Sequence, residues 1–252
     1  MKISVITAAY NSEATVGEAI ASVAAQTHPD VEHLVIEGNS EDGTLEAIER
    51  AGHDRMRLIS EPDDGIYDAL NKGVRNATGD VVGFIHSDDF LAHDGVLARI
   101  ASAFEDPAVE AVFSDLVYVS QADTSRVIRH WSTGAFHPRR LKYGWMPAHP
   151  TLYLRREVYE RFGTYDKNMR IAADYDFILR YFSQATDKSV YIPEVLYKMR
   201  VGGVSNRNWA KIRQKMEEDM LAIRRNRVGG LHTLAFKNLS KVGQFLVRPQ
   251  RS

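Results

Sequence analysis

The segment Gly79-Asp-Val-Val-Gly-Phe-Ile-His-Ser-Asp-Asp-Phe90 decides how the rest of the chain is interpreted. Its apolar run from Val81 to Ile85 predicts a short buried strand that ends at two adjacent carboxylates, Asp88 and Asp89. In an open α/β sheet, ligands bind outside the carboxyl ends of the strands. Paired acids there can hold Mg²⁺ or Mn²⁺, which prefer carboxylate and phosphate oxygens. The same residues also suit a turn followed by a helix N-cap, so the pair alone leaves both interpretations open.

The composition is that of an ordinary globular protein with room for a substantial core. The chain has 252 residues, of which 44% are hydrophobic and 26% charged, so we expect one large domain or two small ones. It contains no cysteine, so any metal must be held by oxygen or imidazole. Neither a signal peptide nor an apolar run near the ~18 residues of a membrane span is recognisable. We therefore expect a cytoplasmic protein.

Charge is divided unevenly along the chain. The net charge is −1, but residues 206–252 contain 11 Lys and Arg against 3 acids, which gives +8 and leaves −9 for residues 1–205. Such a basic tail indicates an anionic partner, either nucleic acid or a lipid surface. No nucleic-acid recognition motif accompanies it, so we do not expect a nucleic-acid partner.

Strand and helix patterns alternate through the first half of the chain, which is typical of a mostly parallel, doubly wound α/β sheet. The second half adds a strand pair at 116–120 and 127–131, and a strand at 190–199 that Pro193 interrupts. We expect this half to extend the same sheet. The predicted strands of the first half are 2–8, 31–36, 57–60, 81–85 and 109–113, with helices after Ser12, around 45–48, over 65–77 with Gly79 as C-cap, and over 95–104.

Two helices are predicted in the tail. The first runs from Trp209 to Arg225 and the second covers 231–247. At 100° per residue, the second helix gathers its apolar side chains on one face and places Lys237 and Lys241 opposite. A basic amphipathic helix of this kind can lie in an anionic membrane interface. It can equally pack against the body of the protein or against a second subunit, as in a homodimer.

Polar clusters follow four successive predicted strands, at 7–11, 37–42, 64–73 and 88–89. Because the carboxyl ends of parallel strands meet at one edge of a sheet, these clusters predict a nucleotide site there. No Gly-x-Gly-x-x-Gly follows the first strand, and no Walker-type Gly-Lys-Ser/Thr is present. A dinucleotide cofactor or an ATPase is therefore disfavoured.

The motifs in these clusters resemble those of family 2 glycosyltransferases with the GT-A fold, more closely the bacterial enzymes that build exopolysaccharide, O-antigen and colanic-acid-type glycans. The motifs are Ile6-Thr-Ala-Ala-Tyr-Asn11, Ile36-Glu-Gly-Asn-Ser-Glu-Asp-Gly-Thr44, Ser60-Glu-Pro-Asp-Asp-Gly-Ile-Tyr-Asp-Ala-Leu-Asn-Lys-Gly73, Ala77-Thr-Gly-Asp80, His86-Ser-Asp-Asp89 and Ile171-Ala-Ala-Asp-Tyr-Asp176.

The resemblance implies a division of the chain and roles for single residues. It implies a GT-A (Rossmann-like) domain at 1–205, with a nucleotide-sugar-binding half at 1–115 and an acceptor half at 116–205, followed by a basic helical extension at 206–252. Glu37, where the family more often has Asp, would recognise the base, commonly uracil. Asp89 would bind the Mg²⁺ or Mn²⁺ that bridges the diphosphate, and Asp88 would face the ribose or the metal. The other residues implied to border the nucleotide and donor sugar are Thr7, Ala8, Tyr10, Asp68, Asn71 and Lys72.

Glycosyl transfer explains why these residue types are needed. Breaking the bond from the sugar C1 to a nucleoside diphosphate puts negative charge on the leaving phosphate, which a metal stabilises as a Lewis acid. The attacking hydroxyl needs a base, and a carboxylate can serve. By the resemblance, Asp174 occupies the base position at the start of a helix, and a single displacement would invert the anomeric carbon. Asp176 points elsewhere, because residues i and i+2 do not share a helix face, so we expect it to be structural or helix-capping.

Three residues are further candidates for contact with the acceptor or the diphosphate: His149, Arg200 and Asp176. His149 matches a histidine that often precedes the strand bordering the acceptor site, but a core or loop histidine would look the same. Some relatives supply a late histidine to the metal near residues 199–203, where this chain has none. Arg200 is therefore expected to neutralise diphosphate, with Ser205 closing the loop over it.

The leading hypothesis is an inverting, metal-dependent glycosyltransferase that uses a nucleotide-sugar, in the first instance a UDP-sugar. Its acceptor would be a saccharide or a glycan on polyprenyl diphosphate, in cell-surface polysaccharide synthesis, and the helix at 231–247 would dock on the inner face of the plasma membrane. A sugar-1-phosphate nucleotidyltransferase is an alternative, but the Gly-rich basic loop it needs is missing after the first strand. A non-catalytic nucleotide-sugar- or glycan-binding protein is another, and the joint presence of Asp88, Asp89 and Asp174 argues against it.

Overall fold

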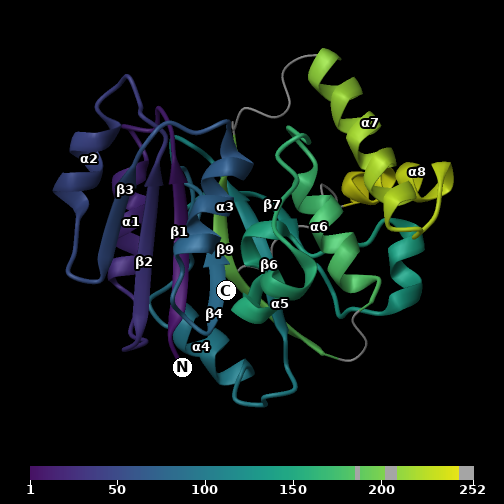
Figure 1. The fold of residues 1–252 in the computed structure, drawn as a ribbon, viewed down its shortest axis with the longest axis horizontal. Coiled ribbons are helices and arrows are strands. Elements are labelled where there is room, and N and C mark those ends of the chain that lie inside the picture. Colours follow the sequence, from purple (N-terminus) through teal and green to yellow (C-terminus); the bar gives the residue numbers. More distant parts are fainter. Residues whose placement is uncertain (185–187, 202–208, 244–252) are drawn as a thin grey trace.

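The computed structural model describes residues 1–184, 188–201 and 209–243. Within these residues, nine strands form a single sheet that helices cover on both faces (Figure 1). The strands are β1 (Ile3–Ala9), β2 (Val31–Glu37), β3 (Met56–Ser60), β4 (Val81–Phe84), β5 (Phe90–Leu91), β6 (Ala111–Val119), β7 (Val127–Trp131), β8 (Tyr153–Arg155) and β9 (Ser189–Arg200). The helices are α1 (Val16–Ala24), α2 (Thr44–Ala51), α3 (Ile66–Asn76), α4 (Val96–Ala103), α5 (Arg156–Phe162), α6 (Ala173–Phe182), α7 (Trp209–Arg225) and α8 (Leu231–Gly243), with 3₁₀ turns η1 (Pro138–Tyr143) and η2 (His149–Thr151).

The strand order is β3-β2-β1-β4-β8-β6-β9-β5, and β7 pairs with β6 beside this path. The pairs β1–β2, β1–β4, β2–β3 and β6–β9 are parallel, whereas β8 runs antiparallel to both β4 and β6. The predicted α/β fold, with a mixed, mostly parallel sheet and C-terminal helices, is therefore confirmed. The second half does extend the sheet of the first, because β8 joins the two.

Two strands of the second half differ from their predicted form. The stretches predicted as separate strands at 109–113 and 116–120 belong to one strand, β6, whose pairing passes through Asp115. Strand β9 also runs through Pro193 instead of ending there. Along β9, Ile192 pairs with Ser114 of β6, and the next paired residue is Val195, opposite Asp115. Pro193 and the next residue form a bulge, where a proline without an N–H is tolerated in a sheet.

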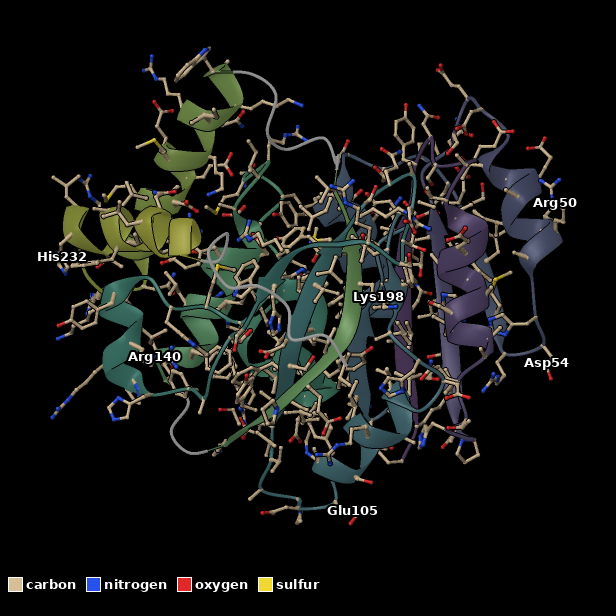
Figure 2. All side chains as sticks on the ribbon, turned by 180° about the vertical axis from the view of Figure 1, so that it is seen from behind. Arg50, Asp54, Glu105, Arg140, Lys198 and His232 are labelled. Atoms are coloured by element: carbon tan, nitrogen blue, oxygen red, sulfur yellow. The ribbon has the colours of Figure 1, made fainter. Side chains whose placement is uncertain are left out.

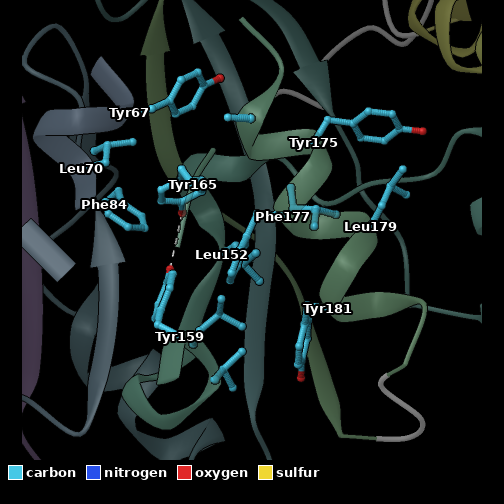
Figure 3. Close-up of a cluster of buried hydrophobic side chains, with 14 of the residues drawn as sticks. Tyr67, Leu70, Phe84, Leu152, Tyr159, Tyr165, Tyr175, Phe177, Leu179 and Tyr181 are labelled. Carbon is cyan, nitrogen blue, oxygen red and sulfur yellow. Dashed lines mark hydrogen bonds between the residues drawn. The ribbon is translucent and has the colours of Figure 1, made fainter. Parts of the chain in front are cut away.

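Apolar side chains fill both faces of the sheet because successive strand residues point to opposite sides. In β1, Ile6 joins the core beneath α3, α5 and α6, whereas Val5 joins the core beneath α1 and α4. The first core is rich in aromatic rings (Figure 3). Tyr165 packs there between Phe84 and Phe177, with ring centroids 5.8 and 5.2 Å away. This core fixes the loop that leads into α6.

The two C-terminal helices pack on the second half of the sheet domain. Helix α7 lies along α6, and α8, marked by His232, lies beside η1, marked by Arg140 (Figures 1 and 2). The bounds of α7 match the prediction, and α8 begins at the predicted residue. The end of the second predicted tail helix, 244–247, the predicted loop at Gly202-Gly203, and Ser205 lie outside the described residues. No helix in the described part of the chain combines the length and apolar character needed to cross a membrane.

Gly79 has a different role from the predicted helix C-cap. Helix α3 ends earlier, and its C-cap residue Ala77 is extended. A Cβ on Gly79 would lie 2.7 Å from the Ser4 backbone nitrogen and 2.9 Å from the Lys2 carbonyl oxygen. The Gly79 N–H also donates to the Ser4 hydroxyl at 2.9 Å. Glycine is needed here so that the start of β4 can approach β1 closely.

Gly83→Ala should destabilise the protein, because Gly83 leaves room for a buried ring. A Cβ on Gly83 in β4 would lie 2.1–2.6 Å from ring atoms of Tyr153 in β8, and overpacking of this kind costs about 1–3 kcal/mol. Urea unfolding would measure the loss. Gly17→Ala is the matched control: no atom lies within 4 Å of its Cβ position in α1, so we expect unchanged or slightly higher stability. Equal stability of the two variants would contradict the close approach of β4 and β8.

Candidate active site

The polar clusters predicted to share one edge of the sheet do meet there. The ends of β1, β2 and β3 are in register, with Ala9 opposite Glu37 and Glu37 opposite Ser60. The loops beyond them are tied together by Asn11, whose N–H donates to the Ser40 hydroxyl and whose Oδ1 accepts the Glu41 N–H, each at 3.0 Å. Asn11 has φ 46°, a left-handed conformation that asparagine tolerates.

Two residues predicted to contact the nucleotide are used inside the protein. Thr7 is fully buried, and its hydroxyl lies 3.0 Å from Nε2 of His33. Glu37 is 1% exposed, and its oxygens accept the Ser40 N–H and the Ser60 O–H, each at 2.6 Å. Burial alone would raise the pKa of Glu37, but these hydrogen bonds outweigh it and hold the pKa below its usual range. Neither side chain is turned to the open edge in this structure.

Two other side chains lie close to Gly38, the residue that follows Glu37. Tyr10 is largely exposed, and a Cβ on Gly38 would lie 3.3 Å from its ring and 2.4 Å from a carboxylate oxygen of Asp63. An aromatic ring and a carboxylate thus flank a residue without a side chain. Asp63 belongs to a recognised motif but was not singled out by the sequence pattern. Ala8, the other predicted neighbour of the nucleotide, is partly buried against the core.

The three residues of α3 predicted to border the donor instead hold the surrounding loops. Asn71 binds the Tyr165 backbone twice, with its Nδ2 donating to the carbonyl at 2.8 Å and its Oδ1 accepting the N–H at 2.9 Å. Lys72 Nζ donates to the Pro62 carbonyl at 2.6 Å. Asp68 accepts the Asp64 N–H and pairs with Lys167 Nζ at 3.0 Å. Asp68 and Asn71 are buried, whereas Lys72 is partly exposed, and their role at the nucleotide and donor sugar stays a prediction.

Asp88 and Asp89 face different environments, and the metal role of each stays a prediction. The Asp89 carboxylate is fully buried and accepts the Arg200 N–H at 2.9 Å and the Tyr197 O–H at 3.1 Å. Burial, with a smaller effect of Asp88, raises its pKa well above the usual range. Asp88 is partly exposed, and the hydrogen bond that it accepts from Arg200 goes to its backbone carbonyl. Asp88 is thus the acid turned toward the open edge.

Arg200 is an internal brace for this loop. Its guanidinium donates to the Asp88 carbonyl at 2.6 Å, forms an ion pair with Glu18 and lies 4.9 Å from the Phe90 ring centroid. The side chain is 6% exposed. Its charge is already paired with Glu18, and its predicted role of neutralising diphosphate stays a prediction.

His86 precedes Asp88 by two residues, and its backbone N–H donates to the Tyr197 hydroxyl at 3.0 Å. Its ring centroid lies 6.1 Å from that of His149. Burial lowers the pKa of His86, and the negative charges of Asp88 and Asp174 act in the opposite direction. His86 was quoted within a motif but was not predicted as a site residue. Its place before Asp88 on the strand end was the only signal for it.

Asp174 stands in the first turn of α6, next to a tyrosine. The Tyr67 hydroxyl lies 3.1 Å from Asp174 Oδ1 and 2.8 Å from the Ile171 carbonyl oxygen, so its single proton is shared between two acceptors. Burial, with the charge of Asp174, raises the pKa of Tyr67 well above its usual range. Tyr67 therefore stays protonated and orients the carboxylate.

Asp176 and His149 lie behind this site. Asp176 is 1% exposed, accepts a hydrogen bond from Asn226 Nδ2 at 3.0 Å and pairs with Arg180. This agrees with the structural role expected for it and argues against contact with the acceptor. His149 lies 2.8 Å from the Tyr165 hydroxyl, and burial lowers its pKa to about 4. It is a neutral core histidine in the second layer of the site.

The available side chains suit a metal ion that takes part of its coordination from the substrate. Within the described residues, no three His, Asp or Glu side chains converge as a metal site. Mg²⁺ commonly takes one or two carboxylates and completes its coordination with substrate phosphates and water. One outward-facing carboxylate, Asp88, fits a Mg²⁺ or Mn²⁺ ion bound together with a diphosphate. It does not fit an all-protein metal cage.

The tail exposes Leu231 and Leu239 of the predicted apolar face but buries a lysine of the predicted basic face. Lys237, expected on the outer basic face of α8, is 3% exposed; its Nζ lies 2.6 Å from Asp219 Oδ1 and 3.3 Å from the Tyr175 ring centroid. A groove of about 710 Å³ instead opens between α7 and α8. Its most exposed apolar residues are Trp209 at 86% and Leu231 at 75%. The groove is also lined by Ile212, Met216, Met220, Leu221, Leu234, Arg213, Glu217 and Arg224.

Known proteins share both sequence and fold with this chain. A PGL/p-HBAD biosynthesis glycosyltransferase of Mycobacterium bovis is 33% identical over 207 residues, which cover 81% of this chain and 78% of that protein. The structure of S. aureus TarS 1–349 in complex with UDP-GlcNAc matches with a TM-score of 0.68 at 20% identity, over 98% of this chain and 72% of that one. The chain spans 43% of the longer TarS structure.

A second solved structure is that of the mannosyltransferase PcManGT from Pyrobaculum calidifontis in complex with GDP-Man and Mn²⁺. It matches with a TM-score of 0.66 at 20% identity, over 97% of this chain and 69% of that one. These neighbours confirm the GT-A-like fold. The mycobacterial relatives do not bear out the narrower resemblance to exopolysaccharide and O-antigen enzymes. The model of the family described as Glycosyl transferase family 2 matches residues 4–169, and the chain therefore belongs to glycosyl transferase family 2.

Proposed function

We propose that this chain is an inverting, metal-dependent hexosyltransferase that moves a sugar from a nucleotide-sugar to a hydroxyl of a saccharide or lipid-linked glycan. The observation that carries the proposal is the partly exposed Asp174 carboxylate in the first turn of α6, which the Tyr67 hydroxyl holds at 3.1 Å. A UDP-sugar is our first choice of donor, since TarS binds UDP-GlcNAc. PcManGT binds GDP-Man, so both donors belong in any test. The family match weighs against the nucleotidyltransferase alternative.

The donor would lie along the edge from Tyr10 to Asp88. The exposed Tyr10 ring can stack on the base, and Asp63 can accept a hydrogen bond from a base N–H across Gly38. Asp88 would hold the divalent cation at the diphosphate. When bound, that cation supplies Lewis-acid stabilisation of the charge that develops on the leaving phosphate. In this arrangement Asp63, rather than the buried Glu37, reads the base.

Asp174 would act as the base for the acceptor. The acceptor oxygen forms a bond to the sugar C1 as the bond from C1 to the diphosphate breaks, and Asp174 takes the hydroxyl proton. The nucleoside diphosphate leaves with the bonding electron pair, and a single displacement inverts C1. Tyr67 keeps one Asp174 oxygen occupied, which leaves the other for the acceptor.

Asp88→Asn should abolish Mn²⁺-dependent donor binding, whereas Asp89→Asn should preserve it. The first change removes the outward carboxylate, and the second replaces an acid that already serves Arg200 and Tyr197. Thermal shift with UDP-GlcNAc and GDP-Man, with and without Mn²⁺, would measure both. Asp89→Asn should cost about 1–2 kcal/mol of stability through weakened hydrogen bonds. If only Asp89→Asn lost Mn²⁺-dependent donor binding, Asp89 would be the metal ligand and this assignment of Asp88 would be wrong.

Asp174→Asn should reduce transfer by roughly 10²- to 10⁴-fold, the usual contribution of general base catalysis, while donor binding persists. Release of UDP or GDP in the presence of a panel of octyl glycosides would measure transfer. Asp176→Asn is the matched control on the same helix. It should lower the melting temperature, because Asp176 is buried, and leave catalysis by the folded fraction intact. Substantial transfer by Asp174→Asn would overturn its role as base.

We further propose that the groove between α7 and α8 docks on an anionic bilayer. Its exposed Trp, Ile, Met and Leu side chains are flanked by Arg213 and Arg224, a composition that suits a membrane interface. Glu217, which also lines the groove, pairs with Arg213 at 2.8 Å, so apolar burial is the main contribution expected to bilayer binding. This surface includes Leu231 and Leu234 of the predicted apolar face of the helix at 231–247 and extends it to α7.

Ile212→Glu should weaken binding to vesicles of phosphatidylglycerol and phosphatidylcholine (3:7) by about 10-fold or more, because burying one such side chain contributes roughly 1.5–3 kcal/mol. Cosedimentation would measure it, and added salt should weaken binding further. Ile128→Glu is the matched control, since Ile128 is similarly exposed on β7. Equal binding by wild type and Ile212→Glu would exclude this surface. A dimer that Ile212→Glu dissociates, without vesicle binding, would assign the groove to a second copy instead.

A further inference from the structure

The start of α6, the helix that carries Asp174, is capped by a carboxylate from α7. The N-cap residue Ala172 has no polar side chain with which to bind its own helix. The Glu218 carboxylate reaches it from α7: Oε2 accepts the N–H groups of Ile171 at 2.8 Å and Ala172 at 2.9 Å, and Oε1 accepts that of Arg170 at 3.0 Å. Successive backbone N–H groups form a concave anion site. Here a side chain of the protein fills it.

Asp174 follows this capped segment directly, and a second contact holds the segment from the opposite side. Tyr67 of α3 lies 2.8 Å from the Ile171 carbonyl oxygen and 3.1 Å from Asp174 Oδ1. Residues 170–172 are therefore held by hydrogen bonds from both α3 and α7. The position of the Asp174 carboxylate depends on both sets of contacts, because a shift of Ile171 would move its carbonyl and Asp174 together relative to Tyr67.

Glu218 is itself held rigidly. Gln214 Nε2 donates to Glu218 Oε1 at 3.0 Å, one helical turn away. The next residue, Asp219, is fully buried between Lys215 and Lys237, at 2.8 and 2.6 Å, which locks α7 to α8. At the far end of α7, Asn226 binds Asp176 of α6. Helix α7 is thus fixed to α6 at two points on either side of the first turn.

We infer that Glu218 is a positioning residue for Asp174, so that α7, in the predicted basic extension, completes the acceptor end of the active site. The inference rests on the proposed role of Asp174 as base. Removal of the Glu218 charge would leave the buried N–H of Ala172 and the partly buried N–H groups of Arg170 and Ile171 poorly satisfied and free the segment to shift. A displacement of about 1 Å at a reacting group can cost on the order of 10²-fold in rate. The proposed donor contacts Tyr10, Asp63 and Asp88 belong to the loops after β1, β3 and β4, so donor binding should be spared.

Glu218→Gln tests this in the full-length protein. The amide retains size and helix propensity, but its NH₂ group cannot accept the backbone N–H groups. We expect kcat, measured with the donor and octyl glycoside that wild type uses best, to fall at least about 10-fold. The donor dissociation constant should stay within about twofold of wild type. Glu217→Gln is the matched control, because Glu217 is the exposed neighbour on α7 and pairs with Arg213. It should behave as wild type.

Several outcomes would overturn the inference. Wild-type kcat in Glu218→Gln would do so, as would an equal fall in donor affinity, or the same fall in kcat in Glu217→Gln. If circular dichroism shows that Glu218→Gln does not fold, Gln214→Ala is the substitute test, because it removes one hydrogen bond to the Glu218 carboxylate. This variant should lower kcat a few-fold with donor affinity intact. An unchanged kcat would refute the inference. Asp174→Asn tests the proposed base separately from the role of Glu218. If that variant still transfers sugar, Asp174 is not the base, whatever the result for Glu218→Gln.

Discussion

The arrangement of the site depends on one buried carboxylate, that of Asp89. It follows β4 and accepts an N–H and an O–H from β9, at Arg200 and Tyr197. This ties the parallel first half of the sheet to the last long strand of the second half. The Asp89 N–H also closes a tight turn onto the His86 carbonyl at 3.0 Å. Because the two acids are adjacent on that turn, fixing Asp89 inward turns Asp88 toward the open edge.

The fold was predictable because its signals are local: apolar runs, helical spacing and polar strand ends lie within a few residues of each other. The environment of each acid could not be predicted in this way. The two partners of Asp89 are 108 and 111 residues away in sequence, so nothing near Asp88 and Asp89 shows which of them is buried. The same limit explains β6 and β9, which run on through an acid and a proline because pairing across the sheet outweighs local interruption.

The recognised motifs identify the family better than they identify ligand contacts. Strand-end loops carry backbone N–H and C=O groups that must be satisfied when buried. Asn71 satisfies both groups of Tyr165, and Lys72 satisfies the carbonyl of Pro62. Glu37 likewise accepts a hydrogen bond from the backbone N–H of Ser40. A conspicuous polar motif can therefore be the scaffold of a site, one layer behind the atoms that meet the substrate.

The tail shows why neither a charge sum nor a helical wheel locates a functional surface. Both treat charged side chains as exposed, yet Lys237 and Asp219 are buried together and Glu218 is enclosed by backbone N–H groups. A carboxylate whose oxygens are filled by internal donors has little capacity left for a ligand. The acids at the open edge differ: Asp88 receives its Arg200 contact on the backbone, and Asp174 shares one tyrosine proton with a carbonyl. Our proposal therefore assigns the chemistry to the two carboxylates that the fold has left incompletely satisfied.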